Sequence, residues 1–263
     1  MTTPPPIDTS VPHSARVWNY WLGGKDNYPA DRTLGDLILK DFPEMVDVAR
    51  AQRTFLLRAV THLADEAGID QFLDLGTGLP THNNTHEIAQ SVNPSARVVY
   101  VDNDPLVLAH ARALLTGTEQ GATDYVDADV HDPDVVLGAA SRTLDLTRPV
   151  GLTMLGILGH HTHETALSLV RSYMERLPSG SFLAIADSTD TSEGMRRAAE
   201  AWNADAPLPY ILRSPEQIGE YFTGLDLVEP GVVPALEWRS SRIDVGGRLP
   251  AAADEYCGMA RKA

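Results

Sequence analysis

Acidic and glycine residues stand together where the first buried strand is predicted to end, and they are the first side chains that could bind a ligand. Asp74 precedes the turn residues Gly76, Thr77 and Gly78. Glycine lets the backbone turn tightly and approach a ligand without an intervening side chain. A carboxylate at this position disfavours pyrophosphate and favours a ligand that carries an ammonium group and a sulfonium. The alternative is a simple strand-to-helix turn that binds nothing.

Two further acids follow the next two apolar runs. Asp102 and Asn103 come where an α/β sheet presents an acid to ribose hydroxyls, and a carboxylate can accept both hydroxyl protons. The alternative for Asp102 is an ordinary helix cap. Asp129 and Val130 follow the third run, where the carboxylate could accept from an adenine amino group while Val130 covers the ring. Without the first two motifs, Asp129 would be interpreted as a loop acid.

Histidines after the fourth apolar run could supply a base. We predict His160 or His161 as the catalytic residue, because either could deprotonate an acceptor hydroxyl or amine beside the reacting group. His163 and Glu164 also invite a metal interpretation, but no H-E-x-x-H pattern places two ligands on one helix face, so we expect no metal. A solvated helix start capped by Thr162 is the alternative for the whole cluster.

Strands and helices must alternate to position these residues. Short apolar runs predict strands at 71–75, 97–101, 123–126, 150–158 and 181–186, and helical periodicity lies between them at 85–91, 105–115, 133–140, 162–177 and 192–203. Alternation of this kind implies parallel pairing through right-handed crossovers. We therefore predict an α/β, Rossmann-like, doubly wound and mostly parallel sheet. Residues 224–233 and 248–261 predict an antiparallel C-terminal strand pair.

The N-terminal part instead has the periodicity of helices, without alternating strands. Residues 1–10 are predicted to be a flexible tail, residues 11–68 a helical extension that acts as a lid, and residues 69–263 the Rossmann-like core. Helical spacing appears at 13–22 and 31–40, and a longer helix follows Pro43.

Aromatic and polar side chains cluster in the first of these helices and in the turn that follows it. We predict that Tyr20, Lys25, Asn27 and Tyr28 bind the acceptor, because they combine apolar surface with polar groups around a flexible glycine pair. The alternative is that the aromatic residues belong to the core.

Composition excludes several functional classes. The 263 residues contain 36 acidic and 21 basic side chains, which disfavours nucleic acid and anionic membranes as partners. The single cysteine, Cys257, cannot form an intramolecular disulfide, and no apolar run approaches the roughly 20 residues of a membrane span. We expect a cytoplasmic protein; its oligomeric state is not predicted.

The motifs DLGTG, VDND and DADV, in this order, resemble the cofactor motifs of class I S-adenosylmethionine-dependent methyltransferases. The stretches SARVWNYWLGGKDNYPADR, FLDLGTGLPTHNNTHEIAQ and RVVYVDNDPLVLAHARALL, with YVDADVHDP and LVEPGVVP, resemble an actinobacterial family formerly catalogued as a domain of unknown function. The resemblance implies S-adenosylmethionine as the cofactor, with its methionine end at Asp74, Gly76 and Gly78, its ribose at Asp102 and Asn103, and its adenine at Asp129 and Val130. Residues 158–164 depart from the expected single histidine followed by apolar residues, which leaves the catalytic role there open.

Together these observations predict a methyltransferase that acts on a small molecule. Methyl transfer needs alignment of the nucleophile and exclusion of water more than a catalytic dyad. Two other hypotheses remain: a non-catalytic S-adenosylmethionine-binding protein, and a nicotinamide-dependent oxidoreductase. Thr81 stands where the latter would carry its third glycine, and Asp74 precedes the first.

Overall fold

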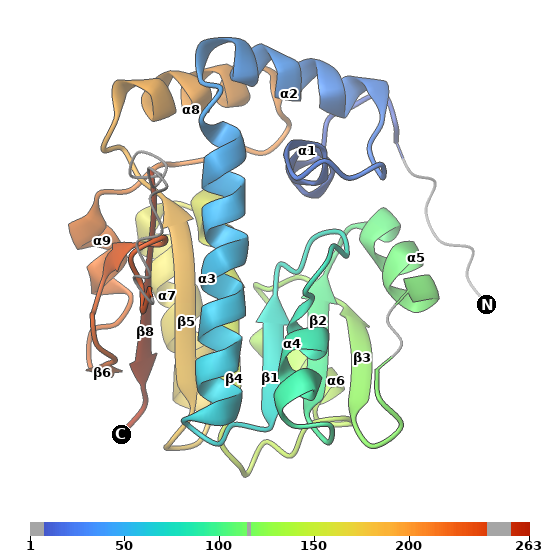
Figure 1. Cartoon of the computed structure of the whole chain (residues 1–263), viewed down its shortest axis with the longest axis vertical. Coiled ribbons are helices and arrows are strands. Elements are labelled where there is room, and N and C mark those ends of the chain that lie inside the picture. Colours follow the sequence, from blue (N-terminus) through green and yellow to red (C-terminus); the bar gives the residue numbers. More distant parts are fainter. Residues whose placement is uncertain (1–7, 115–116, 241–253) are drawn as a thin grey trace.

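A twisted, mostly parallel sheet forms the centre of the molecule in a computed structural model that describes residues 8–114, 117–240 and 254–263 (Figure 1). The strand order is β3-β2-β1-β4-β5-β8-β6, so the chain winds outward in both directions from β1. The five parallel strands are β1 (Gln71–Leu75), β2 (Arg97–Asp102), β3 (Ala122–Asp127), β4 (Gly151–Leu155) and β5 (Phe182–Ser188). The predicted doubly wound sheet is confirmed.

Helices cover both faces of this sheet. α3 (Met45–Asp65) and α4 (Thr85–Val92) lie on one face, and α6 (Pro133–Ala140) and α7 (His163–Arg176) on the other (Figure 1). Alternate residues of each strand enter the two cores: Phe72 packs with Phe55 of α3, whereas Leu73 packs in the cluster that contains Tyr173 of α7. Both faces are buried, which explains why the strands read as continuous apolar runs.

The C-terminal strands close the sheet in the antiparallel direction. β8 (Glu255–Arg261) pairs antiparallel with β5, and β6 (Asp226–Leu227) and β7 (Val233–Pro234) pair antiparallel with β8. Because β8 runs against its neighbours, its first residue, Glu255, lies opposite Ser188 at the carboxyl end of β5.

A layer of helices covers the carboxyl ends of the strands. α1 (Ser14–Trp21) and α2 (Pro29–Asp41) come from the N-terminal segment, and α8 (Glu193–Asp205) follows β5; α5 (Pro105–Leu114) follows β2 beside them (Figure 1). α2 packs directly on α8. A Cβ atom on Gly194 would come within 2.5 Å of the Phe42 ring, so glycine permits this close approach. We call α1, α2 and α8 the roof.

Several boundaries differ from the sequence predictions. The strand predicted at 150–158 ends at Leu155, because Gly156 has a φ of +74° and residues 158–160 form a 3₁₀ turn, η1 (Leu158–His160). The strand predicted at 224–233 is divided into β6 and β7 around Gly231, which has a φ of +88°. α9 (Pro215–Glu220) was not predicted. Residues 1–7 of the predicted tail and 248–253 of the predicted last strand lie outside the described residues.

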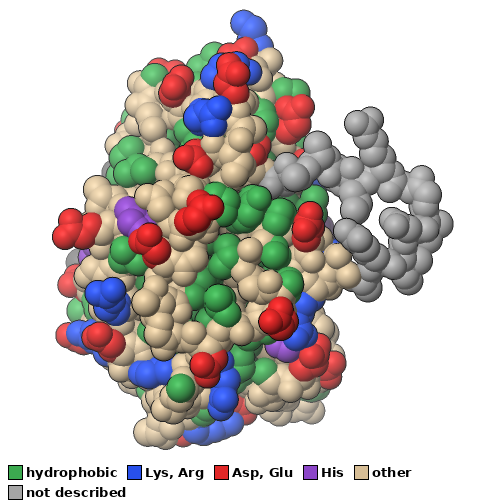
Figure 2. Space-filling view, turned by 90° about the vertical axis from the view of Figure 1, so that its left-hand side faces the viewer, with side chains coloured by type: hydrophobic (Ala, Val, Ile, Leu, Met, Phe, Trp, Pro, Cys, Tyr) green, Lys and Arg blue, Asp and Glu red, His purple; other side chains and the backbone are tan. Residues whose placement is uncertain are grey.

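The surface carries both signs of charge. On the face shown in Figure 2, lysine and arginine side chains lie scattered among aspartates and glutamates, with hydrophobic side chains between them. Among the helices of the described residues, none combines the length and the apolar character needed to cross a membrane.

Candidate active site

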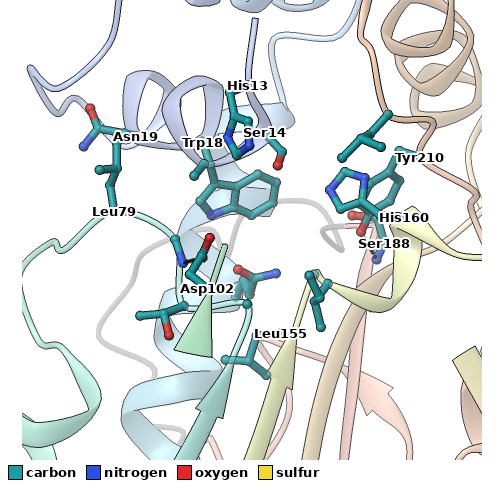
Figure 3. Close-up of a pocket in the computed structure, with 18 of the residues that line it drawn as sticks. His13, Ser14, Trp18, Asn19, Leu79, Asp102, Leu155, His160, Ser188 and Tyr210 are labelled. Carbon is teal, nitrogen blue, oxygen red and sulfur yellow. Dashed lines mark hydrogen bonds between the residues drawn. The ribbon is translucent and has the colours of Figure 1, made fainter. Parts of the chain in front are cut away.

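A cavity of about 330 Å³ lies between the carboxyl edge of the sheet and the roof (Figure 3). The loops after β1 to β4 form its floor, and Trp18 of α1 enters it from above. All eight residues that the sequence analysis assigned to a cofactor border this one cavity: Asp74, Gly76, Thr77, Gly78, Asp102, Asn103, Asp129 and Val130. The carboxyl ends of parallel strands therefore meet here as expected.

The glycine turn after β1 depends on glycine for its shape. Gly76 and Gly78 have φ values of +70° and +66°, a region that side chains disfavour. A Cβ atom on Gly76 would also come within 2.7 Å of Ile157. Thr77 fixes the turn, because its hydroxyl donates to the carbonyl oxygen of Asp74 at 3.0 Å. The result is exposed backbone at the cavity floor.

Asp74 lies beneath this turn and is nearly buried. One carboxylate oxygen accepts from the Thr85 hydroxyl at 2.6 Å and the other from the Thr153 hydroxyl at 2.8 Å. Burial raises the pKa of Asp74, and these two hydrogen bonds oppose the increase. Asp74 thus ties β1, α4 and β4 together while it faces the cavity.

Asp102 connects the first two loops of the floor. Its carboxylate accepts from the backbone N–H of Gly78 at 2.8 Å and from that of Asp104 at 3.0 Å. Burial raises the pKa of Asp102. Each oxygen uses one lone pair in these bonds and keeps another for a ligand.

Asp129 and Val130 form the next part of the floor. Asp129 is half-exposed and accepts from the backbone N–H of His131 at 2.9 Å, and His131 Nδ1 lies 2.7 Å from the same oxygen. The hydrogen bond from the His131 backbone lowers the pKa of Asp129. Val130 is buried, and its carbonyl oxygen accepts from the Tyr173 hydroxyl at 2.9 Å.

The two candidate bases both border the cavity but differ in their surroundings. His160 Nδ1 lies 2.9 Å from the carbonyl oxygen of Pro209. A carbonyl oxygen can only accept, so Nδ1 carries the proton, and Nε2 of the neutral ring is an acceptor. Burial lowers the pKa of His160 from 6.5, which keeps the ring neutral at pH 7. His160 is therefore prepared to take a proton.

His161 is less suited to that task. Burial, followed by the charge of His131, lowers its pKa to about 4. Its ring packs edge-on against His131 at 4.7 Å between centroids, and Nε2 is buried without a hydrogen-bond partner among the described residues. Within those residues, no group of three or more histidine, cysteine or acidic side chains could hold a metal ion.

The structure does not bring the four predicted acceptor-binding residues to the cavity. Tyr20 turns to α2, where its hydroxyl donates to Asp36 at 2.5 Å, and Lys25 is exposed. The Asn27 amide donates to Asn19 and Gly24, and the Tyr28 backbone N–H is bonded to Asp31 at 2.8 Å. For Tyr20 the physical reason is the rotation of α1, which points Trp18 at the cavity instead, whereas Tyr28 packs against the cluster of Leu79, Leu106 and Val107.

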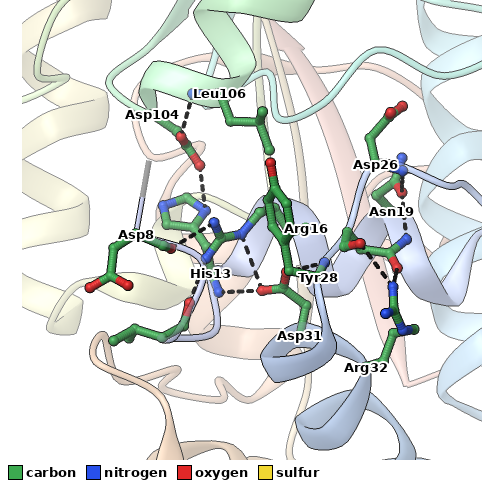
Figure 4. Close-up of polar contacts among 12 residues, drawn as sticks. Asp8, His13, Arg16, Asn19, Asp26, Tyr28, Asp31, Arg32, Asp104 and Leu106 are labelled. Carbon is green, nitrogen blue, oxygen red and sulfur yellow. Dashed lines mark hydrogen bonds and ion pairs between the residues drawn. The ribbon is translucent and has the colours of Figure 1, made fainter. Parts of the chain in front are cut away.

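Ion pairs fasten the N-terminal segment over the cavity (Figure 4). His13 Nδ1 lies 2.9 Å from Asp104, in the loop after β2. Burial opposes ionisation of Asp104, but His13 holds its pKa below the usual value. Arg16 reaches Asp31 at 3.1 Å and donates to the carbonyl oxygen of Asp8 at 3.0 Å, so the chain is already held at Asp8.

A buried polar cluster forms the far end of the cavity, where His160, Ser188 and Tyr210 lie together (Figure 3). The Tyr210 hydroxyl donates to Asp187 at 2.6 Å. Ser188 Oγ lies 2.8 Å from one carboxyl oxygen of Glu255. Burial, followed by the charge of Asp187, raises the pKa of Glu255 to about 8.

The charge of Asp187 is compensated within this cluster. Its other carboxylate oxygen lies 3.3 Å from Arg213, and both side chains are buried. Burial raises the pKa of Asp187 to about 6, and Arg213 limits the increase. At neutral pH, Asp187 is mainly charged while Glu255 is mainly neutral.

Sequence reasoning missed Ser188, Tyr210 and Glu255, and also two residues of α3. Gln52 donates to Glu255 at 3.0 Å, and Arg53 donates to the carbonyl oxygens of His82 and Asn83. Gln52 and Arg53 border the cavity, although they come from a helix that the sequence indicates only as a packing element.

The family model described as S-adenosyl methyltransferase matches residues 1–263. No curated protein matches the chain. Among solved structures, a DUF574 family protein from Streptomyces avermitilis is 46% identical, with a TM-score of 0.93, over 98% of this chain and 100% of that chain. A candidate methyltransferase from Thermobifida fusca is 41% identical, with a TM-score of 0.88, over 97% and 96% of the two chains.

More distant structures share the fold alone. Human N-acetylserotonin methyltransferase, solved with S-adenosylmethionine, is 15% identical, with a TM-score of 0.51, over 84% of this chain and 56% of that chain. The family is instead assigned from the full-length match to the family model and from the two similar structures. The chain therefore belongs to the S-adenosyl methyltransferase family and is an S-adenosylmethionine-dependent methyltransferase.

Proposed function

We propose that the methyl acceptor is a small, largely apolar molecule with a hydroxyl group, and that His160 takes the hydroxyl proton. The observation that carries this proposal is the change in character along the cavity. Acids and backbone groups form the end at Gly76 and Gly78, whereas the other end has His160, and the lining also includes the apolar residues Met195, Ala198 and Trp202 of α8 with Leu208 and Leu212 after it. A site of this size and composition suits a small molecule.

The residues at the acidic end fit the cofactor. Asp74 offers negative charge to an ammonium group, and Asp102 keeps lone pairs for ribose hydroxyls. Gly76 and Gly78 leave room that a Cβ atom would reduce. S-adenosylmethionine supplies an activated methyl group, so the protein needs to align the acceptor and exclude water.

His160 supplies the base in this proposal. Pro209 holds the ring by Nδ1, which leaves Nε2 to accept the proton that the acceptor oxygen loses as its bond to the methyl carbon forms. The rings of Trp202 and Tyr210 pack against the imidazole of His160 and restrict the access of water to it. His161 is not assigned this role, because its Nε2 is buried.

The N-terminal helices act as the lid in this proposal, with Trp18 as the part that contacts ligands. The ion pair between His13 and Asp104 joins the lid to the cofactor side of the floor. Closure of the lid would exclude water from the methyl group, as transfer requires.

The test uses S-adenosylmethionine labelled in its methyl group and a whole extract of cells of the source organism, which contains both small molecules and macromolecules. Wild-type protein should transfer label to compounds that partition into organic solvent. His160→Gln should transfer at least about 100-fold less, the usual contribution of a positioned base. The control is calorimetry with S-adenosylhomocysteine, which should bind both proteins equally.

Three results would contradict the proposal. Label recovered only in precipitated macromolecules would exclude a small acceptor. Equal transfer by His160→Gln would remove the base. Cofactor binding without label in any fraction would indicate a non-catalytic binding protein.

A further inference from the structure

The charges that border the cavity are unequal. Asp74, Asp102 and Asp129 face it, whereas Arg53 is the one lysine or arginine among the described residues of its lining. The methionine end of S-adenosylmethionine carries a carboxylate as well as an ammonium group. The three aspartates alone would repel that carboxylate, so a cation beside it would stabilise the bound cofactor.

Arg53 projects from the middle of α3 toward the loop that follows β1. Its Nη2 donates to the carbonyl oxygen of His82 at 3.0 Å and to that of Asn83 at 2.6 Å. These two bonds use both hydrogens of Nη2. The hydrogen on Nε and the two on Nη1 have no acceptor among the described residues. The Arg53 side chain that carries them borders the cavity. Arg53 is therefore oriented by the protein and still able to bind a ligand.

The charge of Arg53 is not neutralised by the protein. No carboxylate oxygen of the described residues lies within the 4.0 Å of an ion pair, and its two partners are neutral carbonyls. Burial lowers the pKa of Arg53, and the nearby charge of Asp74 is the largest influence that opposes this. Arginine nevertheless stays protonated in proteins, so a half-buried cation remains here without a counter-charge.

We propose that Arg53 binds the α-carboxylate of S-adenosylmethionine, while Asp74 faces the ammonium group of the same moiety. A guanidinium suits this task, because its planar set of N–H donors matches a carboxylate. The proposal deepens the assignment of the cofactor to this cavity and rests on the methionine end lying at the glycine turn. It adds α3 to the elements that recognise the cofactor.

The experiment compares S-adenosylmethionine with decarboxylated S-adenosylmethionine, which keeps the ammonium group and lacks the carboxylate. Calorimetry on the full-length wild-type protein should give tighter binding of S-adenosylmethionine by about 10- to 100-fold, the range of one charge-assisted interaction. Arg53→Met should lose this preference by weakening only the carboxylate-bearing ligand. Arg53→Lys should restore part of it, because lysine keeps the charge but not the fork.

Arg50→Met is the matched control, since Arg50 lies on the same helix with its side chain 69% exposed. It should bind both ligands like the wild type. The decarboxylated ligand is a second control, because a distorted loop at His82 and Asn83 would weaken both ligands together.

The possible results distinguish an error about the role of Arg53 from an error about the placement of the cofactor. Equal weakening of both ligands by Arg53→Met would overturn the carboxylate role and leave Arg53 as a brace of the loop. Wild-type protein with no preference between the ligands would also overturn it. Failure of wild-type protein to bind either ligand would instead contradict the placement of the cofactor in this cavity.

Discussion

Glu255 gives a stability prediction that can be worked from the structure, because its side chain is fully buried at the start of β8. Burial and the charge of Asp187 raise its pKa from 4.5 to about 8. Between these two values the folded protein holds a proton that the unfolded chain releases. The free energy of unfolding should therefore fall as pH rises from 4.5 to about 8 and should lose nothing more from this group above that.

The magnitude follows from the two pKa values. A difference of one unit between the pKa values of the folded and unfolded states corresponds to about 1.4 kcal/mol, so the shift of Glu255 from 4.5 to about 8 corresponds to about 5 kcal/mol in full. Glu255→Gln removes the titrating proton and keeps the shape of the side chain beside Gln52 and Ser188. The variant should differ little from the wild type at pH 5 and be more stable by about 5 kcal/mol at pH 9.

Urea unfolding at pH 5, 7 and 9 measures the difference in free energy of unfolding between the variant and the wild type. Groups that titrate alike in both proteins cancel in this difference. A constant offset from the exchanged hydrogen bonds would be equal at every pH. Glu175→Gln is the control, since Glu175 is exposed on α7 and should give a difference near zero throughout. A Glu255→Gln difference that stays constant within about 1 kcal/mol from pH 5 to pH 9 would refute the reasoning.

Asp102→Ala should weaken S-adenosylhomocysteine binding by about 10- to 100-fold in calorimetry, because it removes charge-assisted bonds to ribose hydroxyls; wild-type affinity in a folded variant would disprove the ribose role. Wild-type transfer should decline on the acidic side of pH 6.5, as pH falls through the pKa of His160, which burial lowers, because protonation removes the acceptor nitrogen; a profile with no acidic decline over the whole pH range in which circular dichroism shows a folded protein would exclude this base. His13→Ala should accelerate S-adenosylhomocysteine dissociation in stopped-flow fluorescence, because the lid loses its ion pair with Asp104; an unchanged rate would mean that this contact does not hold the lid.

The cofactor end of the site could be predicted from the sequence because its information is local. Asp74, Asp102 and Asp129 lie at or just beyond the ends of apolar runs, and parallel strands bring their carboxyl ends to one edge. Gly76 and Gly78 mark a turn whose φ values disfavour other residues. Each of these signals is contained in a few neighbouring residues, so no tertiary contact had to be known.

The remaining part depends on contacts between distant segments. The α1 sequence places aromatic residues on more than one side of the helix, and only packing against α2 decides that Trp18 enters the cavity while Tyr20 bonds to Asp36. Arg53 belongs to α3, and the apolar spacing that predicts this helix does not indicate which of its polar side chains reach the cavity. Glu255 is the first residue of its strand, and the antiparallel direction of β8 is what brings it to the ligand edge.

The roof also has a consequence for how the protein is made. α2 and α8 come from opposite parts of the chain and pack together, with Gly194 against Phe42. Contacts between segments so far apart form late in folding, because closing a long loop costs chain entropy that other contacts must first offset. During synthesis, α1 and α2 leave the ribosome before the sheet on which they rest exists. We therefore expect the site to be complete only after α8 has been synthesised and packed against α2, so that cofactor binding requires both ends of this long loop.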